Sequence, residues 1–131
     1  GDTRLIVEKI LDADALLIGT PIFQASIPGT LKNIFDLLPE KAFLDKVVGI
    51  IATAGSSKHY LIPEQQLKPI LSYMKAQIVG TYVFIEEKDF YRQEIVNEDV
   101  LFRIDQLVED TITLTETYMK IREEKEAKYG F

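Results

Sequence analysis

Three short runs of continuous apolar residues set the strongest limit on what this chain can fold into. They are Ala15–Gly19 (ALLIG), Val47–Ala52 (VVGIIA) and Gln77–Ile85 (QIVGTYVFI). The first two are rich in branched residues and are followed by small or turn-forming residues. A continuous run, in contrast to an alternating one, is typical of a strand that is covered on both faces, as in a parallel sheet. We therefore expect three buried strands.

Helical spacing fills the segments between and around these runs. It predicts helices near 3–12, after Pro28, after Pro63, and from about Asn97 to the end. The last of these includes TITLTET at 111–117, which alternates like a strand, but both flanks are helical in spacing. Strands that alternate with helices predict βαβ units with right-handed crossovers. We expect one α/β domain over residues 1–131, a length that suits a single core.

Three local features carry narrower expectations. Pro69 lies within the third predicted helix and removes a hydrogen bond to the Gln65 carbonyl, so we expect a kink there. Residues 86–89 (EEKD) follow the third strand and are expected to form a solvated, charged loop. His59, the only histidine, is expected at the start of a helix and not in catalysis.

Composition excludes several classes of protein. The chain has no cysteine, which rules out disulfides and thiol-based metal or redox chemistry and fits a reducing, cytoplasmic setting. With a single histidine, we expect no metal site. The net charge of −6 and a pI near 4.8 argue against a nucleic-acid partner. No apolar run approaches the roughly 20 residues that cross a bilayer, and the start does not read as a signal peptide.

The expected ligand site lies where the strands end. In an open parallel sheet, ligands bind outside the carboxyl ends of the strands. The loops there, 20–26 and 53–59, are small, polar and almost uncharged, and they suit a flat heterocycle with amide-like edges. Gly55 allows close approach of the backbone, and Phe23 offers a ring for stacking. Glycine, serine and threonine are also ordinary turn residues, so this pattern alone leaves the plain structural interpretation open.

At these two loops the chain resembles the NADPH-dependent FMN reductase family, which has the flavodoxin-like fold. The segment GTPIFQASIPGTLKNIFD (19–36) resembles the family's strand end and helix start. The segment LLPEKAFLDKVVGIIATAGSSKHYLIPEQQLKPILSYMKAQ (37–77) is similar to flavin reductases that supply alkanesulfonate monooxygenases. Motifs fall in the family's order over residues 13–85. The resemblance implies FMN as cofactor, NADPH or NADH as hydride donor, and flavin or another small electron acceptor as partner.

The resemblance also implies which residues meet the flavin ring. The two loops would contribute Pro21, Ile22, Phe23, Gln24, Ser26, Thr53, Ala54, Gly55 and Ser56. Family members usually have tyrosine at the position of Phe23, often asparagine at that of Gln24, and often glycine at that of Ala54. No side chain is expected to act as an essential catalytic acid or base. A homodimer or homotetramer is expected by resemblance.

The front of the family pattern is missing. A full member begins with a strand, a phosphate-binding loop, a helix and a second strand, and none of these precedes residue 1 here. The expected fold is therefore a flavodoxin-like three-layer parallel sheet without the family's first two strands and first helix, from an N-terminally incomplete domain with one inner sheet edge uncovered. In the sulfonate-system relatives, the helix after His59 can carry an extra-residue π-bulge with a tyrosine. Gln65 stands at about that position here.

Three alternatives stay open from the sequence. The first is a quinone or azo-compound reductase on the same fold, which screening of acceptors would separate. The second is a flavodoxin-like electron carrier, which the acidic charge fits and the Pro-Gly-x-Leu-Lys-Asn helix start (28–33) disfavours. The third is a non-catalytic flavin-binding or assembly fragment, which the absence of a phosphate loop favours.

Overall fold

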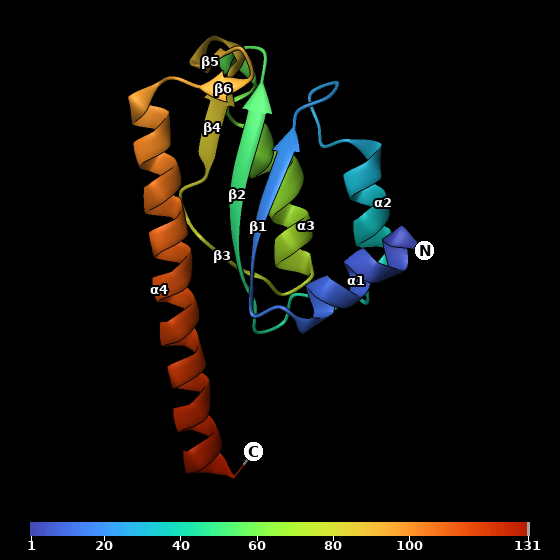
Figure 1. The fold of residues 1–131 in the computed structure, drawn as a ribbon. Helices are drawn as coiled ribbons and strands as arrows, with labels where there is room; N and C mark the ends of the chain where they lie inside the picture. The colour runs from blue at the N-terminus through green and yellow to red at the C-terminus, as the bar shows by residue number, and fades with distance from the viewer. Residues whose placement is uncertain (131) are drawn as a thin grey trace.

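The computed structural model describes residues 1–130 and places a parallel sheet between two helical layers (Figure 1). In chain order the elements are α1 (Asp2–Asp12), β1 (Ala15–Pro21), α2 (Gly29–Leu37), β2 (Val47–Ala54), a 3₁₀ turn (Ser57–His59), a π-helix (Pro63–Leu67), α3 (Lys68–Tyr73), β3 (Gln77–Ile78), β4 (Val83–Glu86), a 3₁₀ turn (Glu87–Asp89), β5 (Phe90–Tyr91), β6 (Glu94–Ile95) and α4 (Glu98–Tyr129). The expected three-layer α/β arrangement is confirmed.

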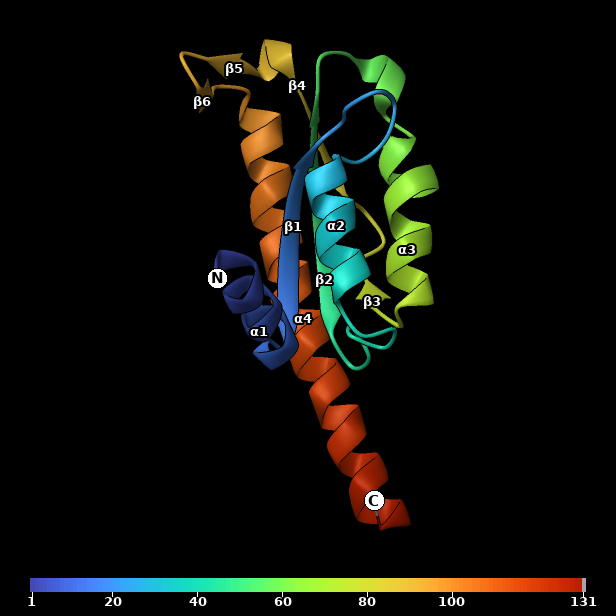
Figure 2. The same ribbon diagram turned by 90° about the vertical axis from the view of Figure 1, so that its right-hand side faces the viewer.

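Strand β2 is the centre of the sheet. It pairs in parallel with β1 from Ala15↔Val47 to Pro21↔Thr53, and with both β3 and β4 on its other side. Helices α2 and α3 cover one face of the sheet and α4 covers the other (Figure 2). The outer side of β1 pairs with no strand in residues 1–130, and Leu17 on this strand is 46% exposed. The expected uncovered edge is therefore present in the described structure.

Side chains of β2 alternate between two separate cores. Val48, Ile50 and Ala52 pack with residues of α2 and α3, whereas Val47 and Ile51 pack with residues of α4. This burial on both faces explains why the strand has a continuous apolar sequence. Gly49 is the one residue of β2 that has no side chain. Because it faces α4, the helix can approach the strand closely there.

The third apolar run does not form one strand, as the sequence predicted, but two. Ile78 pairs with Val48, and Val83 pairs with Ile51. Four residues, 79–82, thus span a stretch that two residues cover on β2, and the chain bulges away from the sheet between them. The amine of Lys68 donates a 2.9 Å hydrogen bond to the carbonyl of Gly80 in this bulge, which satisfies an oxygen that a continuous strand would have paired.

The helix that contains Pro69 begins with a π-helix over Pro63–Leu67. The N–H of Lys68 donates to the carbonyl of Pro63, five residues earlier. The backbone then continues as α3. Pro69 has no N–H to donate, and the wider turn falls directly before it, so the expected irregularity takes the form of a π-bulge. Gln65, which stands at about the position of the tyrosine in the sulfonate-system relatives, lies within this π-helix.

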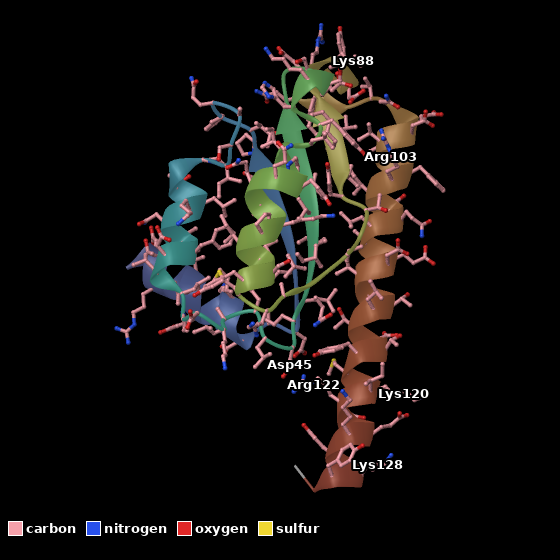
Figure 3. The ribbon with its side chains drawn as sticks, turned by 180° about the vertical axis from the view of Figure 1, so that it is seen from behind. Asp45, Lys88, Arg103, Lys120, Arg122 and Lys128 are labelled. Carbon is pink, nitrogen blue, oxygen red and sulfur yellow. The ribbon has the colours of Figure 1, made fainter. Side chains whose placement is uncertain are left out.

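Helix α4 extends past the sheet and is anchored near Asp45, which adopts a left-handed conformation (φ 67°) in the loop before β2. The Tyr118 hydroxyl donates a 2.9 Å hydrogen bond to Asp45, and this carboxylate raises the pKa of Tyr118. Arg122 Nε lies 3.5 Å from the second oxygen of Asp45. Figure 3 shows the two labelled residues beside each other. Although α4 has 32 residues, no helix within residues 1–130 is long and apolar enough to cross a membrane.

Replacement of Gly49 by alanine tests the close packing of α4 on the sheet. The new Cβ would lie 2.8 Å from Leu17 Cδ2 and 2.9 Å from Thr111 Oγ1. We expect the Gly49→Ala variant to lose about 1–3 kcal/mol of unfolding free energy in urea titrations, because buried side chains have to move. The control is Gly19→Ala in β1, where a Cβ meets nothing within 4 Å. Equal stability of the two variants would contradict the packing argument.

Candidate functional site

A cleft of about 300 Å³ lies at the carboxyl ends of the strands. Three segments build it. The end of β1 contributes Pro21, Ile22 and Phe23, the end of β2 contributes Thr53, Ala54 and Gly55, and the turn after β4 contributes Glu87 and Phe90. Because the strands are parallel, these segments meet at one edge of the sheet, at the top of Figure 1.

The first wall of the cleft is a tight, hydrogen-bonded turn. The N–H of Ile22 donates to the carbonyl of Thr53 at 2.9 Å, which extends the β1–β2 pairing beyond Pro21. Phe23 and Ser26 exchange backbone hydrogen bonds of 2.9 and 3.0 Å. Gln24 and Ala25 between them both have left-handed φ values, 49° and 57°, as in the turns of tight hairpins. The Phe23 side chain is 58% exposed and lines the cleft.

Six of the nine residues predicted to meet a ligand line this cleft. The other three lie around it. Gln24 occupies the tip of the turn. The hydroxyl of Ser26 donates a 3.2 Å hydrogen bond to Gln66 Oε1, which ties the turn to the π-helix. Ser56 precedes the 3₁₀ turn over Ser57–His59, and His59 is the last residue of this turn and not, as expected, the start of a helix.

The third wall of the cleft is the turn after β4, which contributes Glu87 and Phe90. The sequence did not predict this wall, because residues 86–89 were expected to form a solvated loop. That expectation is wrong for Asp89, which is only 5% exposed. One Asp89 oxygen accepts a 2.9 Å hydrogen bond from the N–H of Glu86, and the other accepts a 2.8 Å bond from the Asn97 amide. The backbone bond from Glu86 and the amide bond from Asn97 outweigh burial and hold the pKa of Asp89 below its ordinary value of 3.8.

A local sequence signal for this wall did exist. In a capping box, the residue at the N-cap of a helical turn is followed three positions later by an acidic residue. Glu86 and Asp89 form such a box. Asn97 caps α4 by accepting a 2.9 Å hydrogen bond from the N–H of Asp99. Through Asn97, the start of α4 and the turn that carries Glu87 are joined. No sequence pattern placed Glu87 or Phe90 beside the other two loops, because only the sheet brings them together.

The chemical character of the cleft is mainly apolar. Proline, isoleucine and two phenylalanine side chains supply its surface, and the backbone at 53–55 adds polar groups. Glu87 is the one charged side chain among its lining residues, and no lining residue is cationic. Such a cleft suits a flat ring with polar edges and offers nothing to balance a phosphate.

A larger hollow of about 540 Å³ lies between α2 and α3. Phe35, Leu38, Ile70 and Met74 line it together with a rim of polar residues. Leu38 and Met74 follow the ends of the two helices. Because the helices run in the opposite direction to the strands, this hollow lies toward the amino ends of the strands, away from the cleft. Size alone therefore does not identify the ligand site.

The fold defines an open α/β protein with a mainly apolar cleft at the carboxyl ends of its strands, and comparisons with known proteins place it in a family. Residues 1–90 match the family model described as NADPH-dependent FMN reductase, and the chain belongs to this family. It is 41% identical over 112 residues to an NAD(P)H-dependent FAD/FMN reductase of Geobacillus thermodenitrificans, which covers 85% of this chain and 60% of that protein. The chain thus spans about 60% of the length of this curated relative.

Solved structures share the flavodoxin-like fold. An oxidoreductase of Corynebacterium diphtheriae superposes with a TM-score of 0.77 at 34% identity, covering 88% of this chain and 63% of that one. The apo form of an NADH:FMN oxidoreductase superposes with a TM-score of 0.74 at 30% identity, covering 89% of this chain and 60% of that one. The resemblance stated from the sequence is therefore confirmed at the level of family and fold.

Replacement of Asp89 by asparagine tests the buried cap that holds the third wall. The folded-state pKa of Asp89 is lowered, so its stabilisation is complete above the unfolded-state value and is lost as the pH falls through the folded-state value. At pH 7 we expect Asp89→Asn to lose about 1–3 kcal/mol of unfolding free energy. The difference from the unmodified protein should shrink below about pH 4.

Urea titrations at several pH values between 7 and 3 measure this difference. Asp105→Asn, at an exposed position of α4, is the matched control and should change stability little at any of these pH values. A constant difference between Asp89→Asn and the unmodified protein across the range would show that the carboxylate charge does not stabilise the turn.

Proposed function

We propose that the cleft binds the isoalloxazine ring of FMN and that the protein is an NAD(P)H-dependent flavin reductase. The observation that carries this proposal is the convergence of the ends of β1 and β2 in one cleft. Pro21–Phe23 and Thr53–Gly55, the two loops expected to meet a flavin, line its two neighbouring walls. Membership of the family supplies the chemical class. The proposal covers the flavin ring as the ligand of the cleft, NAD(P)H as the hydride donor, and the electron acceptor.

The size and the lining of the cleft support a flavin ring as its ligand. Its volume of about 300 Å³ is at the lower end of ligand pockets, which suits a ring without its tail. The exposed ring of Phe23 and the half-buried ring of Phe90 come from different loops and give an aromatic, apolar lining. The backbone at Thr53–Gly55 can bond the carbonyl edge of the ring, and Gly55 has open space at its Cβ position.

The residues of this chain would bind and orient, and none is assigned as an acid or a base. The bound flavin would supply the redox chemistry: hydride from NAD(P)H to N5 and a proton from solvent would leave the nicotinamide oxidised and the flavin reduced. The turn closed by Phe23 and Ser26 would keep the ring-facing backbone fixed. The apolar lining would exclude water from the ring face that it covers.

The phosphate and the assembly of the protein lie beyond this cleft. Because the lining has no cation, we propose that the FMN phosphate is held elsewhere, by a segment beside the unpaired edge of β1. A homodimer or homotetramer, free flavin or another small electron acceptor as partner, and a cytoplasmic location are likewise proposed. They are supported by the family and by the lack of cysteine.

The test is a titration of the chain with FMN and with riboflavin, followed by quenching of flavin fluorescence. If the cleft recognises the ring, the fluorescence of both flavins is quenched on binding. Any higher affinity for FMN than for riboflavin measures the contribution of a phosphate site. Steady oxidation of NADPH or NADH with excess FMN, and no partner protein, then separates a reductase from an electron carrier. The absence of quenching by either flavin would refute the proposal.

Replacement of Phe23 by alanine tests the ring contact within the same assay. Since the side chain is 58% exposed, its truncation should leave the folded state intact. We expect riboflavin affinity to fall about five- to thirtyfold, as for the loss of one aromatic stacking contact. Phe102→Ala on α4, where phenylalanine is 67% exposed, should bind as the unmodified protein does. Loss of turnover by orders of magnitude with flavin still bound would contradict a purely binding role for Phe23.

A further inference from the structure

The turn after β4 places one acidic residue, Glu87, in the lining of the cleft on a fixed base. Asp89 accepts hydrogen bonds from Glu86 and Asn97, and the N–H of Val96 donates to the Asp89 carbonyl at 2.9 Å. Phe90 and Ile95 pair in the short β5–β6 hairpin. Glu87 is thus carried on a turn that is bonded on both sides, although its own side chain is exposed. A turn held in this way can position a ligand group, whereas a loose surface loop cannot.

The Glu87 carboxylate is also available to a ligand. No hydrogen bond or ion pair joins it to any described residue, whereas the neighbouring Glu86 lies 3.7 Å from Lys88 Nζ. Asp89, on its other side, is fully engaged. Of the three acidic residues in this segment, the one that lines the cleft is the one without a partner.

The order of the strands decides on which side of a bound ligand Glu87 lies. Strand β2 lies between β1 and β4, so Glu87 stands across the cleft from Pro21–Phe23. A flat ring that lies over the end of β2 has one edge turned toward this carboxylate. The pyrimidine edge of an isoalloxazine has two carbonyl oxygens and, between them, the N3–H, which is the only ring N–H of the oxidised flavin. Backbone N–H groups suit the carbonyls, and a carboxylate suits the N3–H.

We propose that Glu87 recognises the flavin ring, with its carboxylate accepting a hydrogen bond from N3–H. This inference rests on the proposed function, because it assigns a residue to the same site. It makes Glu87 a binding and specificity residue. It does not give the residue a part in hydride transfer.

The experiment compares riboflavin with 3-methylriboflavin, in which a methyl group replaces the N3 hydrogen. Neither compound has a phosphate, so the comparison reports on the ring alone. We expect the unmodified chain to prefer riboflavin about ten- to hundredfold by fluorescence titration, the range for a hydrogen bond to a charged group. In Glu87→Ala this preference should fall to about threefold or less. Glu94→Ala, an exposed glutamate on β6 outside the cleft lining, is the control and should keep the full preference.

The outcomes separate the inference from the function on which it rests. If Glu87→Ala keeps the preference of the unmodified chain, Glu87 does not meet N3–H, while ring binding stands. If riboflavin and 3-methylriboflavin bind equally to the unmodified chain, the inference is likewise overturned. If neither binds, the proposed function itself fails. Glu87→Gln, which keeps the shape of the side chain, guards against a folding defect and should show a preference between those of Glu87→Ala and the unmodified chain.

Discussion

The parallel pairing of β1 with β2 is the interaction on which the rest of the structure depends. Its register, from Ala15↔Val47 to Pro21↔Thr53, brings the two strands to an end at the same level. The bond from Ile22 N–H to the Thr53 carbonyl continues the pairing into the loops. A shift of one residue would exchange the α4-facing and α2-facing side chains of a strand, so both cores hold the register in place. The cleft exists because this register is fixed.

The third side of the cleft depends on a different kind of interaction. Apolar packing brings β4 beside β2, but the direction of the chain after Glu86 is set by the buried carboxylate of Asp89. This group is tied to the cap of α4 through Asn97. One small polar network therefore links the helix on one face of the sheet to the edge at which the cleft lies. A partly satisfied network of this kind would be costly, whereas both Asp89 oxygens are bonded here.

The cleft offers a ligand shape and hydrogen-bonding groups but no positive charge. Apolar side chains supply most of the lining, and Glu87 is its only charged member. Under the proposed function, this arrangement would separate the ring of a flavin from its phosphate. It fits a chain that matches the FMN reductase family over residues 1–90 and spans about 60% of the length of the curated relative described above. The unpaired edge of β1 is the place where further sheet structure can be added.

The sequence by itself determined the elements that repeat a simple pattern. Continuous apolar runs predicted β1 and β2, and helical spacing predicted α1, α2 and α4, because burial on one face or two leaves a direct trace in residue order. It also located two walls of the cleft, since loops at strand ends are local. Only the tertiary structure decided the split between β3 and β4, the burial of Asp89, and the position of Glu87 and Phe90 beside Phe23. The split of the third run and the position of Glu87 and Phe90 depend on pairing of β2 with segments distant in the sequence, and no local pattern records which strand a segment will join. The burial of Asp89 depends on its bonds to Glu86 and Asn97.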